Sequence, residues 1–556
     1  MKRVIFRQNE TNRRRLEAAL VFGVALAVRL AAMFVLGDLP ISRTPQLDSA
    51  AYVGWAGALV NDGSFWPVYP EHAPGYPIFM SVILSAFASL TAVRIVQSIL
   101  GAIGCVLIAR VASRTLTPRA FLPAGLLQAV YAPLIYIDTA LVAESVFIFL
   151  LILGLDLATA VTGRGRAFAA GIVLGLATIV RPTALAVVIA FGIVLLLTRV
   201  KRHATGLQLA AGFAAGALVV IAPVVVKNWR VTGVPMVQAY GGMNFYLGNR
   251  PSGTGTASAR PGGEWDALEG EASRFGYGRN EQDAYYFRKT FEAIGAAPGA
   301  YARLLGSKLL WAVQAEELRD THSYHFFADA LPMLKWLPGF GVVLALAGVG
   351  VVRSSGPGRR WLLVYLGATL VTIVLLVAGT RYRLPLLPGL IVLAGAGIAA
   401  IVDEVRARRW RDVSILGAVA VVVWGLAHAR TDAASRNLAE EWAMTGLSLL
   451  QESRLEEAEN AYRRAIAMDE SSFAWDGLGL VLQRRELRTH AREAFERAVQ
   501  INPQNATAWV HLGLSYELLG NPEAAVDAYR KALSITPQRT ETRQILDAAL
   551  QRYKIQ

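Results

Sequence analysis

The stretch RRRLEAALVFGVALAVRLAAMFVL, residues 13–36, sets an arginine cluster directly against an apolar run. An apolar run of about 20 residues can cross a bilayer as a helix. The same alternation recurs through most of the chain, which is 54% hydrophobic with a mean hydropathy of +0.40. Short basic segments mark the cytoplasmic side of a membrane protein, so the sequence predicts an all-α, polytopic membrane protein. The basic clusters lie at residues 2–15, 114–119, 164–166, 199–203, 353–360 and 406–411.

About eleven spans keep all these clusters on one side of the membrane. This predicts a cytoplasmic N-terminus and two long outer segments, 37–92 and 227–332. Residues 75–91 are also apolar, but a crossing there would invert every later cluster, so we expect them to lie in the outer interface. The expected setting is a bacterial inner membrane. The predicted spans are 16–36, 93–112, 121–137, 144–162, 167–180, 184–198, 207–226, 333–352, 361–379, 385–402 and 412–428.

The net charge of +14 does not indicate nucleic-acid binding. Residues 436–556 hold 15 lysines and arginines against 17 aspartates and glutamates, so the excess lies in the membrane part. There it follows from the orientation rule and from contact with anionic membrane lipids. The single cysteine, Cys105, excludes a disulfide within the chain. The run Leu16–Leu36 is too long for the apolar core of a signal peptide, which favours a retained anchor.

A repeat of 34 residues begins beyond residue 436. This period, with W-x-x-L-G followed by an aromatic residue, alanine and proline, is typical of tetratricopeptide helix pairs. We therefore predict a membrane domain, residues 1–430, and a repeat domain, residues 436–556. Stacked pairs present a concave surface for proteins, which predicts a protein acceptor or partner. Trp475, Leu478, Gly479, Phe495, Ala498 and Pro503 recur as Trp509, Leu512, Gly513, Tyr529, Ala532 and Pro537.

The first outer segment contains PQLDSAAYVGWAGALVNDGSFWPVYPEHAPGYPIF, residues 45–79, which resembles the first loop of GT-C glycosyltransferases. That superfamily includes protein O-mannosyltransferases and aminoarabinose transferases. Further pieces resemble it in the same order, among them APLIYIDTALVAESVFIFLLIL (132–153), GLATIVRPTAL (175–185) and GTRYRLPLLPGLIVLAG (379–395). The resemblance covers roughly residues 16–400. It implies a sugar donor linked to a polyprenyl phosphate and a site on the outer side of the membrane.

Asp48 matches the catalytic aspartate of that superfamily. An acceptor hydroxyl must lose its proton as it attacks the sugar carbon, and a positioned carboxylate can take that proton. From the residues alone, an N-cap role for Asp48 is an equal alternative. Tyr52 follows one helical turn later and is a candidate substrate contact, with packing in the interfacial belt as the alternative.

Cations held near the outer face suit the charge that develops on a leaving phosphate, and arginine binds phosphate through its forked donors. Two acidic residues are candidates for orienting these cations, and two asparagines near a flexible Gly-Gly are candidates for substrate contact. The donor-phosphate candidates are Arg381, Arg383, Arg181, Arg94 and His72, the acids are Glu144 and Asp138, and the asparagines are Asn244 and Asn249.

The sequence has no D-x-D pair, no His/Cys metal spacing and no glycine-rich phosphate loop, so it predicts no resident metal or cofactor. A divalent ion between Asp48 and Glu144 is left open as an alternative. The residues and the resemblance together predict an inverting glycosyltransferase with a polyprenyl-phosphate donor and an extracytoplasmic acceptor. The alternatives are a ligase or polymerase that moves a lipid-linked oligosaccharide, and a non-catalytic membrane-anchored repeat scaffold.

Overall fold

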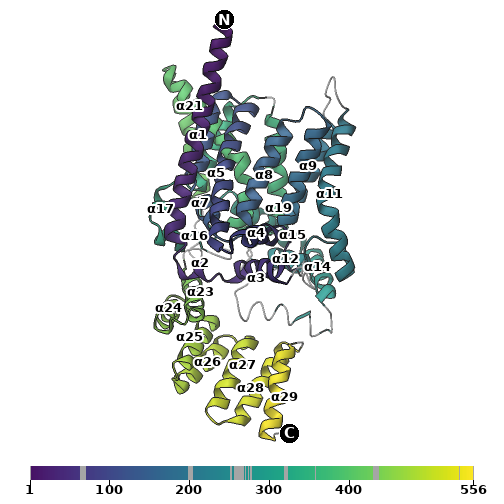
Figure 1. Ribbon diagram of the computed structural model, residues 1–556, viewed down its shortest axis with the longest axis vertical. Helices are drawn as coiled ribbons and strands as arrows, with labels where there is room; N and C mark the ends of the chain where they lie inside the picture. The colour runs from purple at the N-terminus through teal and green to yellow at the C-terminus, as the bar shows by residue number, and fades with distance from the viewer. Residues whose placement is uncertain are drawn as a thin grey trace.

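The computed structural model describes residues 2–62, 71–197, 205–250, 279–318, 323–356, 358–429, 437–537 and 539–554, with residues 253, 255, 268, 271, 272 and 275. Every regular element in these ranges is a helix, so the predicted all-α class is confirmed. A bundle of long helices forms the upper body in Figure 1, and an array of shorter helix pairs lies below it. Parts of the two predicted outer loops and the whole of the cluster 199–203 lie outside the described residues.

Among the described residues, six helices of the bundle are each long and apolar enough to cross a membrane, or seven if the bent pair α6–α7 forms one span. α8 and α9 have 17 residues each, the lower limit of about 17 for a span. The count of eleven spans therefore stays a prediction. The bundle helices are α1 (Lys2–Leu36), α5 (Leu90–Thr115), α6 (Phe121–Ala129), α7 (Ala132–Thr139), α8 (Ala143–Thr159), α9 (Arg164–Val180), α10 (Leu185–Leu196), α11 (Gly206–Thr232), α18 (Phe340–Arg353), α19 (Arg359–Leu375), α21 (Leu387–Arg406) and α22 (Trp410–Ala427).

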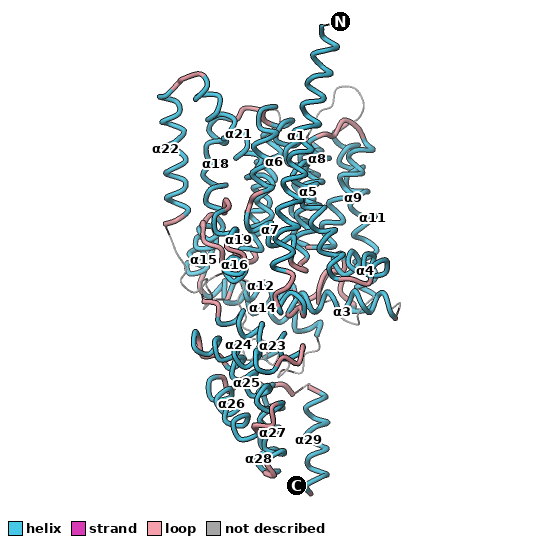
Figure 2. The backbone as a smooth tube through the Cα atoms, turned by 60° about the vertical axis from the view of Figure 1, so that its left-hand side comes forward, coloured by secondary structure: helices cyan, strands magenta, loops and turns pink. Residues whose placement is uncertain are grey.

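A second set of short helices gathers at the bundle end that faces the repeat array, opposite the N-terminus (Figures 1 and 2). One of them, α4, has 13 residues and packs on α3. This length is too short for a crossing and fits the interfacial placement expected for residues 75–91. These helices are α2 (Pro40–Arg43), α3 (Leu47–Asn61), α4 (Gly75–Phe87), α12 (Gly241–Asn249), α14 (Arg279–Ala296), α15 (Pro298–Ala312), α16 (Tyr324–Ala330) and α17 (Met333–Trp336).

The repeat array consists of three helix pairs and a final helix. The signature residues explain the pairing: a side chain at Gly479 would collide with the ring of Phe495, and one at Gly513 with the ring of Tyr529. Both rings are fully buried, so each glycine lets one helix of a pair lie close against the aromatic residue of the other. The helices are α23 (Ala439–Gln451), α24 (Leu455–Met468), α25 (Ser472–Arg484), α26 (Arg488–Ile501), α27 (Ala506–Leu518), α28 (Pro522–Ile535) and α29 (Thr540–Tyr553).

A buried ion pair joins α1 to α7 inside the bundle. Arg29 donates to the Asp138 carboxylate at 2.7 Å, and the Ser145 hydroxyl donates to the other carboxylate oxygen at 2.7 Å. Both charged side chains are almost completely buried. A side chain at Gly101 would collide with Asp138, so α5 also needs a glycine here to admit the pair. Asp138 is thus engaged within the bundle through Arg29.

Breaking this pair is expected to destabilise the protein strongly. Arg29→Met leaves the Asp138 carboxyl buried without its cation, which should lower the free energy of unfolding by about 3–5 kcal/mol. Arg29→Met combined with Asp138→Leu should recover most of that loss, because no uncompensated charge remains. Thermal unfolding in detergent measures both effects, and equal losses in the single and double variants would contradict this account.

Candidate active site

Four charged side chains from distant parts of the chain form one connected cluster, which we call the outer cluster: Asp48, Glu144, Arg181 and Arg381. Arg381 donates to the Asp48 carboxylate at 2.7 Å and lies 3.4 Å from the nearer Glu144 oxygen. Arg181 also pairs with Glu144. The sequence separation between Asp48 and Arg381 is 333 residues. The fold therefore brings together two acids and two arginines that the sequence places only at the same predicted membrane face.

Local backbone breaks hold these side chains at helix ends. Asp48 and Glu144 each stand in the first turn of a helix, α3 and α8 respectively, where a carboxylate is favoured by the helix dipole. Pro182 follows Arg181, which ends α9 and begins a 3₁₀ turn over Pro182–Ala184. Arg381 lies in a single turn, α20 (Thr380–Arg383), followed by a 3₁₀ turn over Leu384–Leu386. No side-chain cap bond is present at the N-terminus of α3, so the structure gives Asp48 an ion pair in place of the alternative N-cap role.

Burial and charge set the protonation of the outer groups. Burial alone would raise the pKa of Asp48, but the Arg381 guanidinium outweighs it and holds that pKa below its ordinary value. Burial lowers the pKa of His72, so His72 is neutral at pH 7. Burial raises the pKa of Tyr52, whose ring lies 5.0 Å from the His72 ring. Asp48 is therefore an ionised carboxylate beside a neutral imidazole and a protonated phenol.

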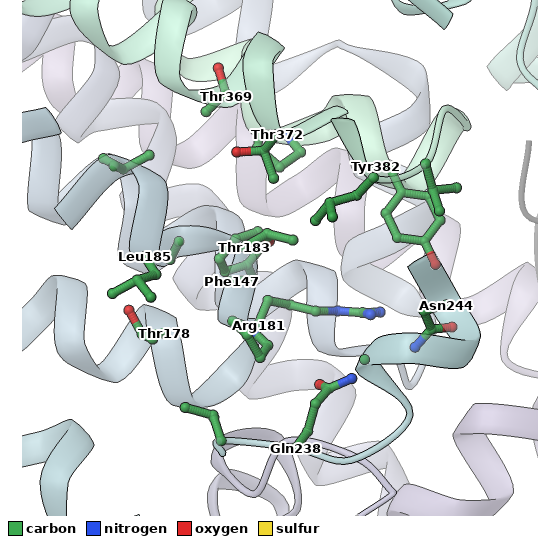
Figure 3. Close-up of a pocket in the computed structure, with 18 of the residues that line it drawn as sticks. Phe147, Thr178, Arg181, Thr183, Leu185, Gln238, Asn244, Thr369, Thr372 and Tyr382 are labelled. Atoms are coloured by element: carbon green, nitrogen blue, oxygen red, sulfur yellow. The ribbon is translucent and has the colours of Figure 1, made fainter. Parts of the chain in front are cut away.

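A cavity of about 530 Å³ opens beside the outer cluster, within the size range of about 300–1,000 Å³ for ligand pockets. Glu144, Arg181 and Arg381 line part of it, and the rest is mainly apolar. Figure 3 shows the Arg181 guanidinium extending across the cavity towards Asn244 and Tyr382. The arrangement joins a charged end to an apolar wall. That wall includes Phe147, Leu151, Leu185, Val187, Ile221, Val225, Ile373, Leu376 and Val377.

Two buried polar atoms of the outer cluster have no hydrogen-bond partner among the described residues: Nε of Arg181 and the second carboxylate oxygen of Glu144. Most buried polar atoms in proteins are hydrogen-bonded. An unpaired donor and an unpaired acceptor at the rim of a cavity are thus available to a ligand. In the described part of the chain, no three His, Cys, Asp or Glu residues gather in a way that could hold a metal ion.

Several predicted site residues are engaged elsewhere. Arg94 donates to the backbone carbonyls of Thr139, at 3.1 Å, and Ser42. Arg383 is buried and forms an ion pair with Glu317 at 2.8 Å, so it does not face the cavity with Arg381. Arg381 and Arg383 point to different sides of the α20 turn. Their spacing in the sequence could not show which of the two faces the cavity.

The two asparagines also separate. Asn244 lines the cavity, whereas Asn249 donates to the carbonyl oxygens of Phe245, Leu375 and Leu376. Lys308 reinforces this contact by donating to the side-chain oxygen of Asn249 at 2.7 Å.

The two glycines of the Gly241-Gly242 pair differ in the same way: Gly241 lines the cavity, whereas Gly242 is needed for packing. A side chain at Gly242 would collide with the backbone of Asp283 in α14, so this glycine admits a neighbouring helix.

Sequence reasoning missed part of the cavity lining. Gln238, Thr369, Thr372 and Tyr382 reach the cavity, and none has a spacing that singles it out. Tyr382 stands between Arg381 and Arg383, so the arginine-rich turn already marked its position. Lys308 was also missed. Burial lowers the pKa of Lys308 to about 8. Its role, which is to hold Asn249 at the end of α19, is visible only in the structure.

Comparison with known proteins agrees with both parts of the fold. Residues 71–226 match the family described as dolichyl-phosphate-mannose-protein mannosyltransferase, and residues 477–540 match the tetratricopeptide repeat family. The first match contains Glu144 and Arg181 but neither Asp48 nor Arg381.

Individual relatives share short stretches. Protein O-mannosyl-transferase TMTC3 of Homo sapiens is 32% identical over 97 residues, 17% of this chain and 11% of the relative. Cilia- and flagella-associated protein 70 of Macaca fascicularis is 32% identical over 90 residues, 16% of this chain. The chain thus spans only 9% and 11% of the length of these two relatives. A crystal structure of MamA overlaps 22% of this chain and 72% of its own, with a TM-score of 0.21 at 25% identity.

Proposed function

We propose that this chain, an integral membrane protein with a dolichyl-phosphate-mannose-protein mannosyltransferase domain and a C-terminal tetratricopeptide repeat, is an inverting glycosyltransferase. Its donor is a sugar linked to a polyprenyl phosphate, and its acceptor is a hydroxyl on the outer side of the membrane. The observation that carries the proposal is the outer cluster beside a largely apolar cavity. A lipid-linked phosphosugar needs this combination of cations and apolar wall.

The reaction requires one proton transfer and one displacement. The acceptor oxygen attacks the anomeric carbon, its proton passes to the Asp48 carboxylate, and the bond from that carbon to the phosphate oxygen breaks. The polyprenyl phosphate leaves as an anion that needs no proton. About a quarter of the Asp48 side chain is exposed, 27%, so an acceptor can reach it. Attack from the face opposite the phosphate inverts the anomeric centre.

Arg381 and Arg181 are the proposed phosphate ligands. Both line the cavity and both carry forked donors, which suit phosphate oxygens. The unpaired Nε of Arg181 gives one donor that needs no rearrangement. Glu144 contacts both guanidinium groups, so we assign it the role of orienting them.

Donor binding should change the basicity of Asp48. A phosphate bound to Arg381 shares the positive charge that keeps the Asp48 pKa low, so the carboxylate becomes a stronger base when the donor is present. The pH profile of kcat/KM reports the free enzyme and that of kcat the substrate complex. We expect the acid limb of kcat/KM to lie below the ordinary carboxyl value of about 3.9, and that of kcat to lie at higher pH. Coincident acid limbs, or a kcat/KM limb above about pH 5, would contradict this assignment.

The repeat array is the proposed holder of a protein acceptor or partner. It lies at the bundle end that carries the outer cluster (Figure 1), and helix-pair repeats present protein-binding surfaces. This arrangement supports the proposed topology, with the array and the site on the extracytoplasmic side and the N-terminus in the cytoplasm.

The chemical class of the sugar donor tests the proposed function. The purified full chain in lipid nanodiscs should transfer labelled hexose from a synthetic polyprenyl-phosphate donor, and not from the matching nucleotide sugar. Mass analysis of envelope glycans and glycoproteins from cells with and without the protein then gives the acceptor. Transfer only from the nucleotide sugar, or no change in any glycan, would overturn it. A product that carries a whole oligosaccharide would instead identify the ligase reading.

A further inference from the structure

We infer that the first repeat helix, α23, is a positioning part of the catalytic centre, because it holds the segment that leads into Asp48. This inference rests on the proposed function. Gln46 lies two residues before Asp48, and its side-chain amide donates to Ser448 at 3.1 Å and to Gln451 at 2.9 Å. Gln46 is 5% exposed and Ser448 is 0% exposed. The contact is therefore a buried polar interface between the membrane part and the repeat array.

Further contacts surround this bond. The Ser448 hydroxyl donates to the backbone carbonyl of Thr44 at 2.9 Å. Arg43 forms an ion pair with Glu452, just beyond the end of α23, at 2.9 Å. Arg43, Thr44 and Gln46 thus all bond to residues 448–452. We call residues 42–46 the bridging segment.

The other side of the bridging segment is held by the membrane part. Arg94 of α5 donates to the carbonyl of Ser42 and, at 3.1 Å, to that of Thr139. The segment is therefore fixed from the bundle by one arginine and from the repeat array by α23. This gives Arg94 a positioning role in place of the phosphate contact expected from the sequence.

The backbone between Gln46 and Asp48 is short and conformationally restricted. Leu47 joins Gln46 to Asp48 in the left-handed region, with φ of 53°, a conformation that non-glycine residues seldom adopt. Such a conformation persists only when the surrounding contacts hold it. Releasing Gln46 from α23 should allow Leu47 to relax and Asp48 to move away from Arg381.

The test compares a double variant at the α23 contact with a single control variant, both in the full-length chain. Ser448→Ala with Gln451→Ala removes the two partners of Gln46 in the repeat array and leaves the outer cluster, and the contact of Gln46 with the Thr44 carbonyl at 3.0 Å, intact. The matched control is Ser472→Ala, which removes a buried hydroxyl that accepts from Asn505 at 2.8 Å inside the repeat array. We expect the first variant to lower kcat about tenfold, because small misplacements of catalytic groups are costly, with KM for the donor unchanged within about twofold. The control should keep the wild-type kcat.

Amide hydrogen exchange gives a readout independent of chemistry. The amides of Arg43, Thr44 and Ala50, which donate to the carbonyls of Leu39, Pro40 and Gln46, should be protected in the wild type and in the control, and should exchange faster in the double variant. Wild-type exchange in the double variant, or an equal loss of kcat in the control, would overturn the inference. If Asp48→Asn abolishes transfer while the double variant retains full kcat, the proposed function stands and the positioning role fails. If no variant affects transfer but exchange still responds, the positioning of the segment stands and the chemistry assigned to Asp48 fails.

Discussion

Asp48→Asn is expected to lower kcat by about 100- to 10,000-fold, the contribution of a positioned general base. Asparagine has almost the same shape as aspartate and can still contact Arg381, but its amide cannot take the acceptor proton. Because the phosphate contacts remain, KM for the donor should change much less than kcat. The measurement is single-turnover transfer from a synthetic polyprenyl-phosphate sugar by the full chain in nanodiscs.

Asp62→Asn is the matched control, since Asp62 is exposed at the other end of α3. It removes an acid from the same helix without touching the outer cluster, so its kcat should equal that of the wild type. An Asp48→Asn protein with wild-type activity would remove the base from the mechanism. An Asp48→Asn strain with an unchanged phenotype would favour the scaffold reading, in which the membrane part does no chemistry.

Arg381→Ala should be the second most damaging change, with a loss of about 100- to 1,000-fold in kcat, as for the removal of one donor from an anion-stabilising site. Arg381 contacts both Asp48 and Glu144, so the substitution removes the proposed phosphate ligand and the main charge that lowers the Asp48 pKa. We therefore expect KM for the donor to rise, and the acid limb of kcat/KM to move to higher pH. The kcat of Arg381→Lys should lie between those of the wild type and Arg381→Ala, because lysine keeps the positive charge but lacks the forked donors of arginine.

Arg119→Ala provides the comparison. Arg119 forms an ion pair with Asp403 at 2.6 Å that is largely exposed, and exposed pairs contribute little to stability. It should leave donor KM, kcat and the pH profile unchanged. Wild-type donor KM, kcat and pH profile in Arg381→Ala would show that Arg381 neither binds phosphate nor controls Asp48.

The sequence located the outer cluster because membrane topology restricts where charge can lie. Asp48 lies in a predicted outer segment, and Glu144, Arg181 and Arg381 lie at the ends of apolar stretches on the same predicted face, so the sequence indicated a shared site there. Hydrogen bonds to backbone carbonyls follow no such pattern. The separation of Arg383 from Arg381, and of Asn249 from Asn244, depends on which carbonyls each helix break exposes, and composition does not record this.

The contact between the bridging segment and α23 was equally invisible in the sequence. It joins glutamine, serine and threonine side chains that are about 400 residues apart, as the separation of 402 between Gln46 and Ser448 shows. Such residues are common on any polar surface, and nothing in their spacing distinguishes a buried interface from solvated loops. The repeat signature predicted the helix pairs and left their docking partner open.

The 333-residue separation between Asp48 and Arg381 has a consequence for biosynthesis. During translation the ribosome releases Asp48 early, and domains fold in order from the N-terminus. The guanidinium that pairs with Asp48 reaches the membrane only when the last spans are inserted, and α23 emerges later still. A nascent or prematurely terminated chain that stops before residue 381 therefore lacks the assembled centre, and we expect it to be inactive in the proposed transfer.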